Sequence, residues 1–217
     1  MFDLLLFDLD GTLVDTRQDI AEAVNHALEL HGRPAVPLET VISWVGDGLD
    51  DMMSRAFRTD DASMVAQLVE EFRVEYKAHC TDFSRPYRDC ATTLSALRRH
   101  GKRLSVLTNK PQDLSLEIFR RLELLQYFDH VVGPSEPALR KPNPSNLLWL
   151  ARDAGVSPDR TLMIGDSKND ILVAHNAGVA SCGCTFGYIG RAGLLHYQPT
   201  FLIDDWPALL KLADRQD

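Results

Sequence analysis

The sequence predicts an α/β fold, built as a doubly wound and mostly parallel sheet with an all-helical domain inserted into it. Short continuous apolar runs recur along the chain and end in polar segments. Such runs are typical of strands buried on both faces, as in parallel sheets. Amphipathic helical patterns separate the later runs, and this alternation of strand and helix indicates βαβ units.

The first predicted strand is the run LLLF at residues 4–7. Further apolar runs predict strands at residues 104–107, 131–132, 161–164, 180–186 and 200–203. Between them, apolar side chains recur three or four residues apart, as Leu114 and Ile118 do, which is the spacing of one helix face. The chain therefore reads as strands connected by helices from about residue 86 onward.

The segment from residue 16 to residue 85 breaks this alternation, because it shows helical patterns only. Its apolar stripes fall at residues 20–28, 49–57 and 65–76. We therefore predict a discontinuous α/β core of residues 1–15 and 86–217, with a helical cap domain of residues 16–85. Such a cap is expected over the carboxyl ends of the strands, where sheets of this kind bind ligands.

Composition excludes several classes of protein. The 217 residues are 45% hydrophobic, which excludes global disorder, and the formal net charge of −8 argues against nucleic-acid binding. Apolar runs stay far below the roughly 20 residues that a membrane span needs, so no membrane partner is expected. The four cysteines lack the spacing of a zinc or redox site, which favours reduced thiols and a cytoplasmic location.

The motif DLDGT at residues 8–12 directly follows the first predicted strand. Side chains at positions i and i+2 of extended chain point the same way, so Asp8 and Asp10 are expected to face one cleft. A surface turn is the alternative for two aspartates alone. The buried strand before them, and the glycine and threonine after them, favour a site.

The motif GDSKND at residues 165–170 follows another apolar run and adds Asp166 and Asp170. Carboxylates gathered at strand ends repel one another unless a cation lies among them, and hard oxygen ligands in this number suit Mg²⁺. For Asp170 alone, capping of the helix that follows is an equal alternative.

Two further segments carry groups that suit an anion. Thr108 and Asn109 follow a strand, where a hydroxyl and the backbone N–H groups of a helix start can bind phosphate. Lys141 precedes a helix whose start is marked by prolines. A lone lysine before proline is usually a solvated loop residue, so its meaning depends on the other motifs.

These four segments, in this order, resemble the haloacid dehalogenase-like hydrolase superfamily over nearly the whole chain. Within it the chain is most similar to the phosphoglycolate phosphatases. The supporting motifs include GDG at residues 46–48, TNKP at 108–111, KPNP at 141–144 and GY at 187–188. The resemblance implies Mg²⁺-dependent hydrolysis of a small phosphomonoester through an aspartyl-phosphate, with 2-phosphoglycolate as the first candidate substrate. A sugar-phosphate phosphatase, a pyrophosphatase and a β-phosphoglucomutase are the alternatives, and a monomer or homodimer is expected.

The same resemblance implies a role for each core residue. Asp8 would be the nucleophile, and Asp10 would act first as general acid and then as general base. Mg²⁺ would bind Asp8, the backbone carbonyl of Asp10, and Asp166. Lys141 would offset negative charge in the transition state. Thr108 and Asn109 would hold phosphoryl oxygens, and Asp170 would orient Lys141 or a metal-bound water.

The cap carries the candidate groups for binding the rest of the substrate. Gly46, Asp47 and Gly48 are predicted to form the loop that enters the site, with a tight turn between cap helices as the alternative. Because its charge would repel an anionic substrate, Asp47 is expected to point away or to cap the next helix. One cap arginine could pair with a substrate carboxylate, and the sequence does not distinguish among Arg17, Arg55 and Arg85.

Overall fold

The structure is a computed structural model that describes residues 1–213 of the chain. Its main sheet has six parallel strands in the order β5-β4-β1-β6-β7-β8, so the predicted fold class is confirmed. The strands are β1 (Leu4–Phe7), β4 (Arg103–Leu107), β5 (His130–Val132), β6 (Thr161–Gly165), β7 (Ala180–Cys184) and β8 (Phe201–Ile203).

Strand β1 lies between β4 and β6, and this position determines where the site forms. Leu5 is in register with Leu104 of β4 and with Leu162 of β6. All four residues of β1 are buried, because strands cover both edges and helices cover both faces. Residues that follow β1 therefore lie between those that follow β4 and those that follow β6.

Helices cover the two faces of the sheet. Leu4 and Leu6 share one apolar cluster with α7 and α8, while Leu5 and Phe7 belong to the cluster that contains α5, α6 and α10. This division follows the alternation of side chains along a strand. The core helices are α5 (Cys90–Arg99), α6 (Gln112–Arg121), α7 (Ser145–Ala154), α8 (Lys168–Ala177), α9 (Gly190–Leu195) and α10 (Trp206–Ala213).

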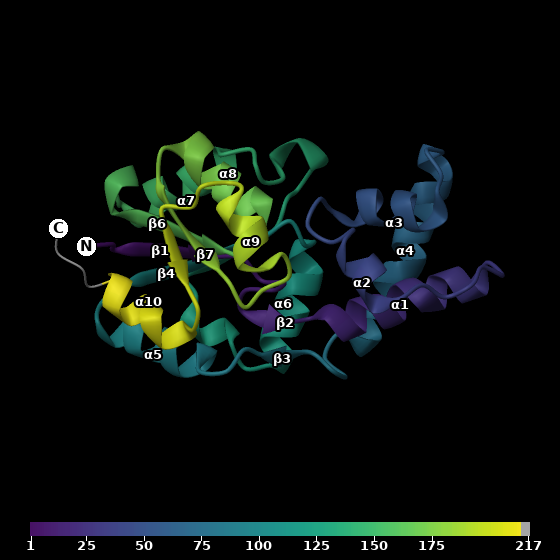
Figure 1. Cartoon of the computed structure of the whole chain (residues 1–217), viewed down its shortest axis with the longest axis horizontal. Coiled ribbons are helices and arrows are strands. Elements are labelled where there is room, and N and C mark those ends of the chain that lie inside the picture. The colour runs from purple at the N-terminus through teal and green to yellow at the C-terminus, as the bar shows by residue number, and fades with distance from the viewer. Residues whose placement is uncertain (214–217) are drawn as a thin grey trace.

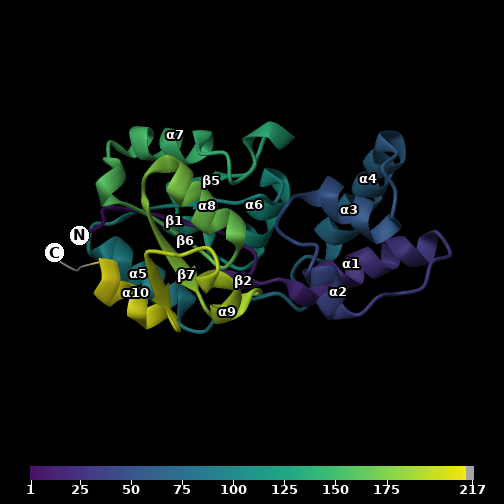
Figure 2. The ribbon, with the colours of Figure 1, turned by 45° about the horizontal axis from the view of Figure 1, so that its top comes forward.

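Four further helices stand apart from the sheet, at the end of the molecule opposite the N-terminus (Figures 1 and 2). They are α1 (Arg17–Leu30), α2 (Leu38–Ile42), α3 (Leu49–Phe57) and α4 (Ala62–His79). Helix α1 packs against each of the other three. These helices form the predicted cap, and the loop before α3 reaches back to the core.

A short antiparallel ribbon joins cap and core. It pairs β2 (Val14–Asp15) with β3 (Arg85–Pro86), and Asp15 is in register with Arg85. The ribbon was not predicted, because two-residue strands carry no periodicity. It brings the outgoing and returning chain together at the predicted boundaries, and the division at those boundaries stays a prediction.

Two features bear on the environment of the protein. Within residues 1–213, no helix is long and apolar enough to cross a membrane. The four cysteines, Cys80, Cys90, Cys182 and Cys184, are all free and buried. Burial raises the pKa of the Cys90 thiol above its usual value, so this thiol stays protonated and unreactive at neutral pH.

Candidate active site

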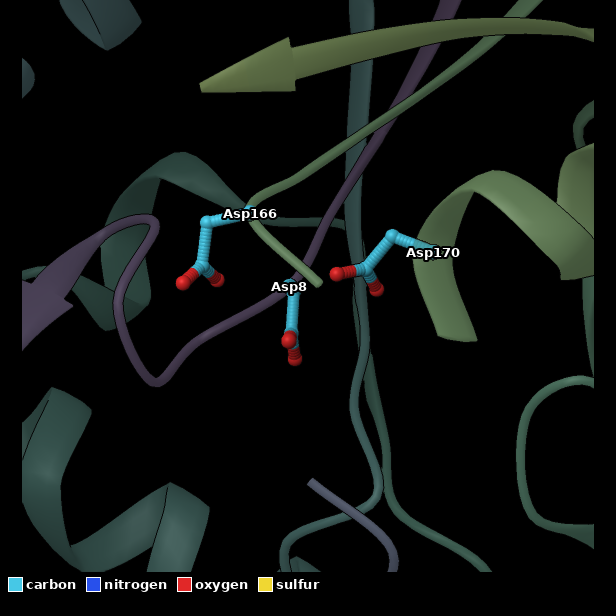
Figure 3. Close-up of side chains that lie close together, drawn as sticks. All are labelled: Asp8, Asp166 and Asp170. Atoms are coloured by element: carbon cyan, nitrogen blue, oxygen red, sulfur yellow. The ribbon is translucent and has the colours of Figure 1, made fainter. Parts of the chain in front are cut away.

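Three aspartates come together at the carboxyl edge of the sheet. Asp8 follows β1, and Asp166 follows the neighbouring strand β6. Asp170 lies in the first turn of α8. All three are buried, and one carboxylate oxygen of each lies within 4.8 Å of the other two. Figure 3 shows Asp8 between the other two side chains. Two motifs about 160 residues apart in the sequence therefore form one acidic cluster.

Local hydrogen bonds orient the two outer aspartates. The Thr12 hydroxyl donates to Asp166 Oδ1 at 3.0 Å, and the Tyr188 backbone N–H donates to Oδ2 at 2.7 Å. The backbone N–H and hydroxyl of Ser167 donate to Asp170 Oδ2 at 3.0 and 2.6 Å, which closes a capping box at the start of α8. Asp170 thus caps the helix and also faces the cluster, so the two interpretations left open by the sequence are compatible.

Lys141 supplies the positive charge of this cluster. Its side chain is 2% exposed, and Nζ lies 3.0 Å from Asp8 Oδ1 and 2.5 Å from Asp170 Oδ1. Burial disfavours the charged amine, but attraction to Asp170 and Asp8 outweighs it and raises the pKa of Lys141. The lysine is therefore a buried ammonium group and not the solvated loop residue of the alternative interpretation.

One lysine does not balance three buried carboxylates. Burial, and then repulsion from Asp170, raise the pKa of Asp8 to about 6 although Lys141 opposes the shift. Burial, and then repulsion from Asp170 and Asp8, raise the pKa of Asp166 well above its usual range. A cation among these oxygens would reverse that repulsion. The donor set is made of hard oxygens, so it fits a divalent cation such as Mg²⁺.

Glycines make room for the acidic cluster. A Cβ on Gly11 would lie 2.3 Å from Asp166 Oδ2, and a Cβ on Gly187 would lie 2.1 Å from Asp166 Cβ. On Gly165 it would lie 2.1 Å from Asp170 Cγ. Contacts this short do not occur, so any larger residue at these positions would displace a carboxylate.

Asp10 lines the same cavity as Asp8, as its spacing predicted, but its carboxylate has separate partners. Lys110 Nζ donates to Asp10 Oδ1 and Oδ2 at 2.9 and 3.1 Å. The Thr16 hydroxyl donates to Oδ1 at 2.6 Å and lies 2.8 Å from the Tyr188 hydroxyl. The Lys110 ammonium also lies 4.5 Å from the centre of the Tyr76 ring. Asp10 is thus held between a core lysine and the first residue of the cap segment.

Lys110, Thr16 and Tyr188 were not predicted as site residues. The signal for Lys110 was present, because it stands two positions after Thr108 at a strand end, as Asp10 does after Asp8. Tyr188 belongs to the GY motif at residues 187–188, which supported the resemblance without giving the tyrosine a role, and Thr16 carried no signal. Their contacts depend on how the cap segment and the loop after β7 pack, which local spacing does not encode.

Thr108 and Asn109 are both buried and line the cavity, and the Asn109 side chain makes hydrogen bonds within the protein. The Asn109 amide nitrogen donates to the carbonyls of Gly46 at 2.9 Å and Lys141 at 3.0 Å. Its amide oxygen accepts from the Lys141 backbone N–H at 2.7 Å. The side chain thus ties the Lys141 loop to the cap and does not point freely at a phosphoryl group.

The loop of residues 46–48 enters the site as predicted, but the expectation for Asp47 is wrong. Gly48, not Asp47, is the N-cap of α3, and no side chain caps that helix start. Asp47 Oδ1 instead accepts from Asn169 Nδ2 at 3.0 Å, and Oδ2 accepts from Arg55 at 2.9 Å. Gly46 and Gly48 have φ of 119° and 113°, which favour glycine and turn the loop toward the core.

Core and cap together line a cavity of about 270 Å³. Its floor includes Asp8, Asp166 and Lys141, and its cap side includes residues 45–49 and Arg55. Pockets for drug-sized ligands start at about 300 Å³, so this one suits a small ligand. Buried carboxylates at the floor, an ammonium beside them and a small volume are suited to phosphoryl chemistry.

Comparison with known sequences agrees with this chemistry. The profile of the haloacid dehalogenase-like hydrolases matches residues 5–184. The chain is 38% identical over 210 residues to a phosphoglycolate phosphatase from Agrobacterium fabrum, covering 95% of this chain and 90% of that one. It is 35% identical to a phosphoglycolate phosphatase from Mannheimia succiniciproducens, with 98% of both chains covered.

Comparison with solved structures gives the same relation at the level of the fold. The crystal structure of a predicted phosphoglycolate phosphatase from Haemophilus somnus superposes with a TM-score of 0.92. The two chains are 31% identical, and the superposition covers 98% of each. Cap and core are thus arranged in that protein as they are here.

Proposed function

The chain belongs to the haloacid dehalogenase-like hydrolase family, and we propose that it hydrolyses 2-phosphoglycolate to glycolate and phosphate. The observation that carries the proposal is the buried cluster of Asp8, Asp166 and Asp170 around Lys141, at the floor of a small cavity. The choice of substrate is supported by relatives over 30% identical along nearly their whole length.

In the first step, an Asp8 carboxylate oxygen attacks phosphorus and forms an aspartyl-phosphate, while the bond from phosphorus to the glycolate oxygen breaks. The Leu9 N–H donates to Asp8 Oδ1 at 2.7 Å and, with Lys141, holds the carboxylate in one orientation. Asp10 gives a proton to the leaving oxygen, so glycolate departs as an alcohol.

In the second step, water attacks the phosphorus of the aspartyl-phosphate and the bond to Asp8 breaks. Asp10 now takes the proton from that water, which restores both aspartates and releases phosphate. Lys110 and Thr16 position Asp10 for both transfers, since they contact its carboxylate directly. A closed cap would keep other water out of the cavity.

Like charges must be offset for a carboxylate to approach a phosphate. Lys141 and the Thr108 hydroxyl lie at the cavity and would stabilise the phosphoryl oxygens. We propose that Mg²⁺ is held by the side chains of Asp8 and Asp166 and by the backbone carbonyl of Asp10. When bound, it supplies positive charge next to the transferred group. Asp170, whose oxygens bond to Lys141 and Ser167, orients the lysine.

A panel of phosphomonoesters assayed with Mg²⁺ tests the substrate. We expect 2-phosphoglycolate to have the highest kcat/KM, because the cavity is small and lined by the cap loop. A sugar phosphate, pyrophosphate or β-glucose 1-phosphate that exceeded it tenfold would replace the substrate and leave the phosphatase chemistry in place.

Two measurements test the chemistry itself. Asp8→Asn should lower turnover by on the order of 10⁴ or more. A substrate made chiral at phosphorus with oxygen isotopes should give phosphate with net retention of configuration, because each of two in-line displacements inverts the phosphorus. Net inversion would show a single displacement by water, without a covalent intermediate. Chelation should abolish activity and Mg²⁺ should restore it, whereas full turnover in excess chelator would exclude the metal.

The proposal also covers the cellular location, the partner and the oligomeric state of the enzyme. Four free and buried cysteines suit a reducing cytoplasm, and this location is part of the proposal. The partner is a small phosphomonoester, with neither nucleic acid nor membrane required. A monomer or homodimer is expected, which sedimentation analysis would resolve.

A further inference from the structure

The three cap arginines that the sequence left undistinguished have different surroundings. Arg17 pairs with Asp15 at 2.6 Å and lies over the Tyr188 ring. Arg85 donates to the backbone carbonyls of residues 81, 82 and 84. Of the three, Arg55 is the one that lines the active-site cavity. Arg55 is therefore the cap arginine placed to recognise the substrate.

A core lysine meets Arg55 at the same carboxylate. Arg55 donates to Asp47 Oδ2 at 2.9 Å, and Lys168 Nζ lies 3.2 and 3.3 Å from the two oxygens of Asp47. Asn169 donates to Asp47 Oδ1 at 3.0 Å. Arg55 lies on cap helix α3 and Lys168 begins core helix α8, so the cluster bridges the two parts of the molecule.

The cluster of Arg55, Lys168 and Asp47 has an excess of positive charge. Two cations surround one carboxylate, so the set carries one net positive charge. Its side chains are part-exposed, at 42% for Arg55, 46% for Lys168 and 23% for Asp47. The cavity's other lysines, Lys110 and Lys141, are buried and already contact catalytic carboxylates. The excess charge that an incoming anion can neutralise is therefore at the cap side of the cavity.

We propose that Arg55 and Lys168, oriented by Asp47, form the subsite that binds a carboxylate on the leaving group. This inference rests on the proposed function, and it assigns the substrate class as phosphomonoesters with a carboxylate close to the phosphate. One Arg55 N–H donates to Asp47, and a guanidinium carries five donors. Arg55 can therefore contact the Asp47 carboxylate and a substrate carboxylate at the same time. A neutral leaving group would leave the positive charge uncompensated.

The subsite also explains the position of Asp47. Alone, the Asp47 carboxylate would repel an anionic substrate, but here it holds two flexible side chains in place before the substrate arrives. Preorganisation of this kind reduces the entropy lost on binding. Because the cations come from cap and core, a bound carboxylate would also favour the closed arrangement of the two.

The test compares two substrates that differ in the carboxylate alone, 2-phosphoglycolate and ethyl phosphate. Arg55→Gln and Lys168→Gln should each lower kcat/KM for 2-phosphoglycolate by on the order of 10²-fold, and leave ethyl phosphate within about threefold. A buried recognition site would discriminate more, but these groups are part-exposed. Arg55→Lys should recover part of the loss, because it keeps the charge without the planar fork.

Arg73→Gln is the matched control. Arg73 also joins cap to core, through Asp113 at 2.7 Å, but it does not line the cavity. Arg73→Gln should change kcat/KM for the two substrates by the same factor, whatever its effect on cap closure. Binding of glycolate, measured by calorimetry, gives a readout independent of turnover, and its dissociation constant should rise in Arg55→Gln and stay unchanged in Arg73→Gln.

The outcomes separate this inference from the proposed function. If the wild-type enzyme prefers 2-phosphoglycolate and both glutamine variants keep that preference, the subsite is overturned and the function stands. If the wild type hydrolyses ethyl phosphate equally well, the proposed substrate fails and the subsite fails with it. Loss of activity on both substrates in folded Arg55→Gln would also overturn the subsite, since Arg55 would then serve the common chemistry.

Discussion

Replacing Gly187 with alanine should disable the site through one methyl group. A Cβ at this position would lie 2.1 Å from Asp166 Cβ and 2.5 Å from Oδ2, whereas ordinary contact begins at 3.4 Å. Gly187 is not among the residues with positive φ, so its backbone accepts alanine without strain. The conflict is therefore with Asp166, and relieving it requires Asp166 and the loop that carries Gly187 to separate by more than 1 Å.

That displacement determines how far kcat/KM should fall. Misplacement of a catalytic group by about 1 Å can cost on the order of 10²-fold in rate. Asp166 would also lose its hydrogen bonds from Thr12 and the Tyr188 N–H, and changes in the groups that orient a metal ligand weaken metal affinity by about 10- to 100-fold. We expect kcat/KM for 2-phosphoglycolate to fall by roughly 10² or more at fixed Mg²⁺, with part of the loss recovered at high Mg²⁺.

The assay is a Mg²⁺ titration of kcat/KM, together with thermal unfolding of the metal-free protein. Gly178→Ala is the control, because Gly178 has a φ of 67° and nothing within 4 Å of its added Cβ. The left-handed conformation there should cost about 1 kcal/mol of stability, and kcat/KM should be unchanged. If folded Gly187→Ala keeps both kcat/KM and Mg²⁺ affinity within about threefold of wild type, the packing of this glycine against Asp166 does not matter to catalysis and the reasoning is refuted.

Three further outcomes are expected. Lys110→Met should lower kcat by roughly 10² for an alkyl phosphate, because Asp10 loses its ammonium partner. The loss should be smaller for an aryl phosphate, since an aryl leaving group needs little protonation. Equal losses on both substrates would contradict a positioning role for Lys110. Asp10→Asn should show the same ordering of substrates with larger losses, and the reverse ordering would exclude Asp10 as the acid. The pKa of Asp8 is about 6 in the folded protein and 3.8 in the unfolded chain, so between these pH values the native state binds more protons than the unfolded state. In chelator, the free energy of unfolding should therefore fall as pH rises from about 4 through 6. Asp8→Asn should flatten this dependence, and an unchanged slope measured by thermal unfolding would show that Asp8 is not the group responsible.

The local sequence was sufficient to predict the strands and the residues at their ends. The run Leu4–Phe7 is continuously apolar because β1 is covered on every side, and Asp8 directly follows it at the carboxyl end of the strand. Likewise the i, i+2 spacing places Asp8 and Asp10 at one cavity. These features depend on neighbours a few residues away, so periodicity and turn residues encode them.

The order of the strands, by contrast, is a property of the tertiary structure. Because β1 lies between β4 and β6, Asp10 meets Lys110 from one neighbour and Asp8 meets Asp166 from the other. No local pattern records which strand ends will be adjacent. The sequence identified the acidic residues, while strand order decided which cation and which carboxylate each one would contact.

The cap side of the site was decided in the same way. From the sequence, Asp47 was expected to avoid the site and three arginines were equivalent. The structure places Asp47 between Arg55 and Lys168, residues 113 positions apart that come from different parts of the fold. A charged side chain's role depends on the charges facing it across space, and those are determined only when cap and core pack together.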